Sequence, residues 1–167
     1  MKSLALRIGV ALLAIAVVTT AADAQRRRAR RGGAAGPGDR AQVGGHVGYI
    51  FDGSHALIGA QASFPIARQV DFYPSFDYYF VSNATLWSLN FDARILPPGP
   101  YRYGYLGAGL NVAHASAGGL GDTQTNVNLL GGLEGRRGRI RPYAEARLIL
   151  GHGSSFQIQG GVNFPLR

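Results

Sequence analysis

Hydrophobic and polar residues alternate with a period of two through most of the chain after residue 40. In residues 70–80 the even positions are largely apolar or aromatic, and the odd positions carry Asp71, Tyr73, Ser75, Asp77 and Tyr79. Similar alternation runs through residues 87–95, 126–133, 140–150 and 156–164. Because successive side chains of a β-strand point to opposite faces, the pattern predicts a strand in each of these five segments.

Three further strands are predicted where glycine and other small residues blur the alternation, over residues 42–51, 56–66 and 101–113. No segment after residue 40 shows a helical stripe. Strands of roughly 9–11 tilted residues cross a bilayer, and an even number of antiparallel strands closes without exposed edges. The sequence therefore predicts an all-β fold, an eight-stranded antiparallel up-and-down transmembrane barrel over residues 41–167.

The two faces of the predicted strands differ in bulk and in charge. The interior of an eight-stranded barrel is just wide enough to be filled by side chains. We therefore expect the bulky apolar face to point outward to lipid, with the aromatic residues Phe72, Phe76, Trp87, Phe91, Phe156 and Phe164. The other face would line the lumen with glycines and a polar network that pairs opposite charges and plugs it: Asp71, Asp77, Asp92, Arg94, Glu145 and Arg147.

A soluble exported barrel shows the same alternation with the faces reversed. Such a lipocalin-like barrel would bind an apolar ligand in its centre. This alternative stays open at the level of the sequence.

The first 24 residues have the layout of a secretory signal peptide. Lys2 and Arg7 precede an apolar run of 11 residues at 8–18, and Ala22-Asp23-Ala24 fits a small-x-small cleavage site. The apolar run is shorter than the roughly 20 residues of a transmembrane helix. We therefore expect export and a mature chain that begins at Gln25.

The net charge of +8 is concentrated on a short arm, residues 25–40, which has six arginines and one aspartate. The arm has no apolar period and is expected to be disordered. Residues 1–24 carry a net charge of +1 and residues 41–167 a net charge of +2. In the cytoplasm such an arm would favour nucleic acid, but the export signal argues against nucleic acid as a partner.

Taken together, the export signal, the eight alternating strands and a last strand that ends in an aromatic residue resemble the small outer-membrane β-barrels of the outer-membrane protein A/X type. The final segment QIQGGVNF ends on Phe164, as last strands of this family usually do, although three residues follow it. The resemblance implies location in the outer membrane, contact with its lipid, and recognition of the last strand by the barrel-assembly machinery.

The resemblance also implies that both termini face the periplasm. The longest external connection is then expected at residues 114–123, and Arg68, Arg136, Arg137, Arg139 and Arg167 fall on the periplasmic rim. Guanidinium groups suit phosphate and carboxylate partners. We therefore hypothesise an anionic periplasmic partner for the rim and for the arm residues Arg26, Arg27, Arg28, Arg30 and Arg31. A solubilising tail without a specific partner is the alternative.

Candidate chemistry is sparse. There is no cysteine, the four histidines lie in separate segments without metal-ligand spacing, and no motif predicts a cofactor. His152-Gly153-Ser154 resembles the His-x-Ser pair of a lipid A deacylase family, but no acidic residue follows Glu145 to orient the histidine. We therefore predict a structural or interaction role in the cell envelope and no enzyme, with lipid A modification as a lesser alternative.

Overall fold

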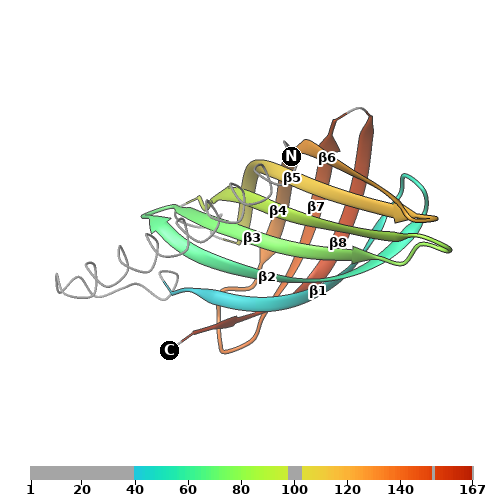
Figure 1. Ribbon diagram of the computed structural model, residues 1–167. Helices are drawn as coiled ribbons and strands as arrows, with labels where there is room; N and C mark the ends of the chain where they lie inside the picture. Colours follow the sequence, from blue (N-terminus) through green and yellow to red (C-terminus); the bar gives the residue numbers. More distant parts are fainter. Residues whose placement is uncertain (1–39, 98–102, 152, 167) are drawn as a thin grey trace. The chain divides into compact units, whose positions relative to one another are not determined.

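Eight β-strands make up the computed structural model, which describes residues 40–97, 103–151 and 153–166 (Figure 1). The strands are β1 (Gln42–Ile50), β2 (His55–Ala67), β3 (Val70–Tyr79), β4 (Thr85–Ile95), β5 (Gly104–Ala117), β6 (Leu120–Glu134), β7 (Arg141–Leu150) and β8 (Ser154–Pro165). In the described part of the chain, no helix is long and apolar enough to cross a membrane.

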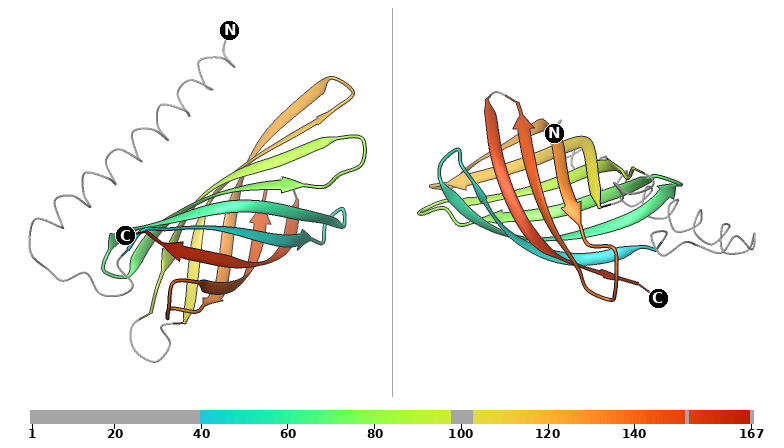
Figure 2. Two further views of the ribbon diagram at one scale, coloured as in Figure 1. Left: turned by 90° about the horizontal axis from the view of Figure 1, so that it is seen from below. Right: turned by 180° about the vertical axis from the view of Figure 1, so that it is seen from behind.

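The strands follow one another around a closed barrel. Each strand pairs antiparallel with the next in sequence, and β8 pairs with β1 from Gln42↔Pro165 to Ile50↔Gln157. The views in Figure 2 show this closure, with the start of β1 beside the end of β8. The predicted all-β, eight-stranded antiparallel up-and-down barrel is confirmed. We call the rim where β1 begins and β8 ends the terminal rim.

Alternation along each strand separates an interior face from an exterior face. In β7, Arg141, Tyr143, Glu145, Arg147 and Ile149 are buried, and every residue between them is exposed. The same period of two appears in β3 and β4, where buried positions are polar or tyrosine and exposed or half-buried positions are mainly apolar. The bulky apolar face therefore points outward, and the polar face fills the barrel.

The connection expected as a long external loop at residues 114–123 is instead a tight hairpin. Strand β5 runs on to Ala117 and β6 begins at Leu120, with His114↔Thr123 and Ala117↔Leu120 among the pairs. Gly118 and Gly119 form the turn with φ angles of 58° and 83°. Two consecutive residues with positive φ are what a two-residue type I′ hairpin needs, and glycine supplies them without strain. The loop prediction was wrong because the glycine pair closes a turn.

Candidate functional site: the lumen and the terminal rim

The barrel interior contains all six charged residues that the sequence predicts for the lumen. Asp71 and Asp77 project inward from β3, Asp92 and Arg94 from β4, and Glu145 and Arg147 from β7. Each is at most 4% exposed. The structure brings four of them together with uncharged side chains in the middle of the barrel, and Asp71 and Arg94 meet nearer the terminal rim.

Arg147 is the centre of the middle group. Its Nη2 atom lies 3.0 Å from Asp92 Oδ2 and 3.0 Å from Glu145 Oε1. Glu145 also accepts hydrogen bonds from the Tyr105 hydroxyl at 2.9 Å and from Gln159 Nε2 at 2.8 Å. Since β4, β5, β7 and β8 all contribute, this group ties distant parts of the barrel wall together across the lumen.

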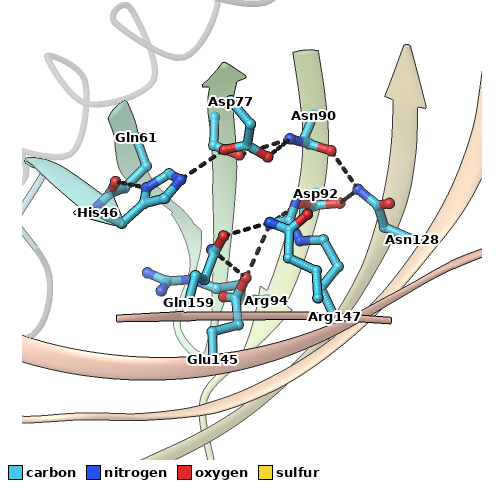
Figure 3. Close-up of polar contacts among 12 residues, drawn as sticks. His46, Gln61, Asp77, Asn90, Asp92, Arg94, Asn128, Glu145, Arg147 and Gln159 are labelled. Carbon is cyan, nitrogen blue, oxygen red and sulfur yellow. Dashed lines mark hydrogen bonds and ion pairs between the residues drawn. The ribbon is translucent and has the colours of Figure 1, made fainter. Parts of the chain in front are cut away.

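Asp77 belongs to a second chain of contacts that crosses the barrel (Figure 3). Its Oδ1 atom lies 2.7 Å from His46 Nε2, and its Oδ2 atom accepts a hydrogen bond from Asn90 at 2.9 Å. Asn128 donates to Asn90 Oδ1 at 2.9 Å and to Asp92 Oδ1 at 3.0 Å. This chain links β1, β3, β4 and β6 and joins the Arg147 group at Asp92.

Arg94 organises the lumen nearer the terminal rim. It donates to Glu134 at 3.3 Å and to Ser63 at 3.0 Å, and it lies 3.5 Å from Asp71 Oδ2. Its guanidinium carbon sits 3.8 Å from the centre of the Tyr73 ring, within the range of a cation–π contact.

Apolar residues cluster at the other end of the lumen. Ile50, Leu57, Tyr79 and Ile149 form a buried cluster, which we call the apolar cap, and Val81 and Leu86 pack against it. These residues lie at the ends of β1, β3 and β7 and near the start of β2, next to the hairpin turns. Along the barrel, the lumen therefore passes from charged groups through an amide-rich middle to an apolar cap.

Interior glycines make room for these large side chains. A methyl group at Gly132 would lie 2.5 Å from the Tyr105 hydroxyl oxygen, and one at Gly59 would collide with His46 Nε2 and the Phe76 carbonyl oxygen. At Gly44 it would meet Asn163 and Gln61. The glycines that blur the alternation in the sequence therefore give the polar network its space.

The aromatic residues predicted to face lipid all lie on the exterior face. Phe76, Phe156 and Phe164 are exposed, and Phe72, Trp87 and Phe91 are half-buried among their neighbours. Trp87 lies between Phe76 and His114, with ring centres 6.3 and 5.2 Å away.

Several polar residues of the network were not singled out as site residues from the sequence. Four of them lie on strand faces that the alternation predicts to be polar: Asn90, Asn128, Gln157 and Gln159. His46 and Gln61 are harder to find because their interior neighbours are glycine or serine, so the polar face of β1 and β2 has little contrast. Continuing the period of two through the glycines would have placed both residues in the lumen.

The arginines of the terminal rim differ in their surroundings. Arg136 is half-buried, and its charge interacts with Glu134 and Asp71; burial lowers the pKa of its guanidinium, an effect that these two acids oppose. Arg137 and Arg139, in the turn between β6 and β7, are exposed, as is Arg68 between β2 and β3. Exposed guanidinium groups on this rim are therefore concentrated next to β6 and β7.

Some predicted residues lie outside the described part of the chain: the signal segment 1–24, Arg26, Arg27, Arg28, Arg30 and Arg31 of the arm, His152, and Arg167 of the rim. Ser154 begins β8 and is exposed. The carboxylate of Glu145 is held inside the barrel by Tyr105, Arg147 and Gln159. The described residues contain no cluster of three or more His, Cys, Asp or Glu side chains suited to a metal ion.

Two bacterial β-barrels of known structure have the same architecture. The N-terminal β-barrel domain of OprF from Pseudomonas aeruginosa matches 77% of this chain and 98% of its own, with a TM-score of 0.65 and 17% identity. Neisserial surface protein A matches 75% of this chain and 96% of its own, with a TM-score of 0.59 and 17% identity. The chain has the fold of the small outer-membrane β-barrels.

This small outer-membrane barrel fold is also matched by a designed protein, TMB2.3, which covers 77% of this chain with a TM-score of 0.54 and 12% identity. No protein-family model matches the chain. No curated protein matches it at a significant level. The similarity is therefore one of architecture.

Proposed function

We propose that this protein is an integral outer-membrane β-barrel with a closed lumen and a structural or interaction role in the cell envelope. The observation that carries the proposal is the reversed polarity of the barrel. Exterior side chains such as Val47, Leu106 and Leu133 are 63%, 70% and 65% exposed, and the interior is filled with charged and amide groups. A bilayer is the environment that suits such an exterior.

A lipocalin-like barrel is a poorer fit to this arrangement. A site for an apolar ligand is concave and lined mainly by apolar groups. The central positions here hold Arg147, Asp92 and Asn128, each fully buried and in contact with other polar groups. An apolar ligand would have to displace these contacts, so the polar interior argues against a central apolar ligand.

Closure of the lumen follows from two barriers in series. The polar network lies in the middle of the barrel, and the apolar cap lies at the end next to the hairpin turns, which supports closure. Eight strands leave little room beyond that taken by side chains. The barrel would then separate the two sides of the membrane instead of conducting solutes.

Cell fractionation and extraction test the proposal. A membrane barrel sediments with the outer membrane, needs detergent for release, and shows a heat-dependent shift on gel electrophoresis. Release of folded protein by osmotic shock without detergent would contradict the proposal and favour the soluble alternative. A mature N-terminus at Gln25, read by mass spectrometry, would support export by the predicted signal peptide.

Two partners are proposed for the protein, one for its last strand and one for its arm and terminal rim. Phe164, the penultimate residue of β8, points outward, which supports recognition of this strand by the barrel-assembly machinery, as the resemblance implies. The arm and the terminal rim are proposed to contact an anionic periplasmic partner, because both are rich in arginine. No catalytic role is proposed.

Deleting residues 26–31 tests the role of the arm. We expect the deletion to weaken association of the barrel with anionic envelope fractions while its heat-dependent gel shift stays unchanged. Unchanged association would indicate that the arm is a solubilising tail.

A further inference from the structure

A groove opens on the exterior wall of the barrel beside the terminal rim. It has a volume of about 430 Å³ and is lined by Tyr103, Leu133, Glu134, Gly135, Pro142, Tyr143 and Ala144. We call it the rim groove. Leu133 projects outward from β6, and Pro142 and Ala144 project outward from β7. The wall that would face lipid is therefore hollowed at this position, with a largely apolar lining.

Backbone hydrogen bonds join the segments that line the groove. The Glu134 amide donates to the Tyr103 carbonyl oxygen at 2.7 Å, and the Gly135 amide donates to the Pro142 carbonyl oxygen at 2.8 Å. Gly135 has no side chain to fill the space, and a methyl group there would lie 3.2 Å from the Pro142 ring. The hollow therefore lies where the small residues Gly135 and Ala144 stand among larger lining residues such as Leu133 and Pro142.

A cationic turn begins where the groove ends. Residues 135–140 read Gly-Arg-Arg-Gly-Arg-Ile and join β6 to β7. Arg136 is half-buried and interacts with Glu134 and Asp71, whereas Arg137 and Arg139 are exposed. Gly138, between those two, adopts a φ of 88°, which reverses the chain within the turn. Two unshielded guanidinium groups therefore lie within four residues of Gly135, which lines the groove.

We propose that the rim groove and this turn bind one molecule of an anionic phospholipid. An acyl chain would lie against Leu133, Pro142 and Ala144, and the phosphate would be held by Arg137 and Arg139. Guanidinium groups form forked, charge-assisted hydrogen bonds with phosphate oxygens. The proposal rests on the membrane location proposed above and names one partner for the rim, a lipid of the inner leaflet.

Charge complementarity favours an anionic lipid over a zwitterionic one. Glu134 is buried and interacts with the charges of Arg94 and Arg136, so the exposed part of this turn presents only positive charge. A basic residue near a membrane surface strengthens the attraction of anionic lipid. Two such residues beside an apolar groove would retain one lipid more strongly than the bulk membrane does.

Native mass spectrometry of the folded, detergent-solubilised mature chain tests the proposal. The probes are phosphatidylglycerol and phosphatidylcholine with identical acyl chains. We expect one phosphatidylglycerol to remain bound, and the double variant Arg137→Gln/Arg139→Gln to weaken its binding by roughly 30-fold. The control Arg68→Gln removes an exposed rim arginine at a different turn and is expected to keep the lipid.

The role of the groove is tested separately with Ala144→Phe, which fills the hollow without changing charge. This variant is expected to weaken binding of phosphatidylglycerol. In a separate measurement on the wild-type protein, free glycerophosphate, which lacks acyl chains, is expected to displace phosphatidylglycerol poorly. Equal retention of the two phospholipids, or equal losses in the Arg68→Gln and double variants, would overturn the proposal. If the folded chain were soluble without detergent, the proposed membrane location would itself be wrong.

Discussion

At the scale of single residues, the interior depends on contacts between buried groups of opposite charge. Arg147 contacts both Asp92 and Glu145 at 3.0 Å, and all three are almost fully buried. A buried ion pair is not in itself strongly stabilising, because desolvation offsets the attraction. Removing one partner is costly, since the remaining charges stay buried and uncompensated. The network is therefore sensitive to loss of any single charged member.

Arg147→Ala is expected to lower the free energy of unfolding by about 3–5 kcal/mol, because it leaves two carboxylates unpaired in the lumen. Urea unfolding in detergent micelles, followed by tryptophan fluorescence of Trp87, measures the change. The control Arg68→Ala removes an exposed arginine and should shift the free energy by less than about 0.5 kcal/mol. Equal midpoints for the two variants would mean that Arg147 is not needed to balance the network.

Gly59 gives a second test at the same scale. A methyl group at this position would collide with His46 Nε2 and the backbone of Phe76, so Gly59→Ala must displace the His46–Asp77 contact. Overpacking of this kind costs about 1–3 kcal/mol. Gly45→Ala is a matched control, because its methyl group would meet its nearest atom at 3.6 Å. If thermal unfolding of both variants matched the wild type, the interior would be looser than its contacts indicate.

At the scale of elements, the sequence predicts strands well where bulky and polar residues alternate and less well where glycine interrupts. Strands β3, β4 and β7 match the predicted segments to within a few residues. Strands β5 and β6 continue toward the turn further than predicted, because Ala113, Ala115 and Ala117 give no contrast and the pair Gly118-Gly119 is compatible with a loop as well as with a tight turn. The contacts of the lumen lay beyond prediction, since alternation assigns a face but not a register.

The β5–β6 hairpin allows a test confined to one element. Strand β6 pairs with β7 only from Val127 onward, so residues Leu120–Asn126 depend on β5 alone. Gly119→Val places a branched side chain at a φ of 83°, at a cost of about 1–3 kcal/mol. We expect faster amide hydrogen exchange in the hairpin tip and unchanged exchange in β7.

Gly118→Asn is the control for the hairpin, since asparagine accepts positive φ in type I′ turns. Its exchange pattern should match that of the wild type. If Gly119→Val increased amide hydrogen exchange in β7 as much as in the hairpin tip, the hairpin and the barrel would unfold as one unit.

At the scale of the whole molecule, the barrel reverses the usual placement of polar and apolar groups along most of its described wall, the apolar cap excepted. Alternation in the sequence was compatible with either orientation, and only the volume available inside eight strands favoured the apolar face outside. His46, Tyr105 and Gln159 illustrate how that volume is used: each fills space that an interior glycine leaves free. A barrel of eight strands is narrow, and its interior glycines are therefore needed to accommodate the large polar side chains.

Conductance in planar bilayers tests the closed lumen as a property of the whole barrel. The polar network and the apolar cap act in series, so loss of one leaves the other in place. We expect near-zero conductance from the wild-type protein and from Arg147→Ala, and also from Leu57→Ala, which thins the cap. The triple variant Leu57→Ala/Tyr79→Ala/Arg147→Ala removes bulk from both barriers and is expected to admit small ions, provided that it keeps its heat-dependent gel shift. Large, steady conductance from the wild-type protein would show that the side chains do not block the lumen.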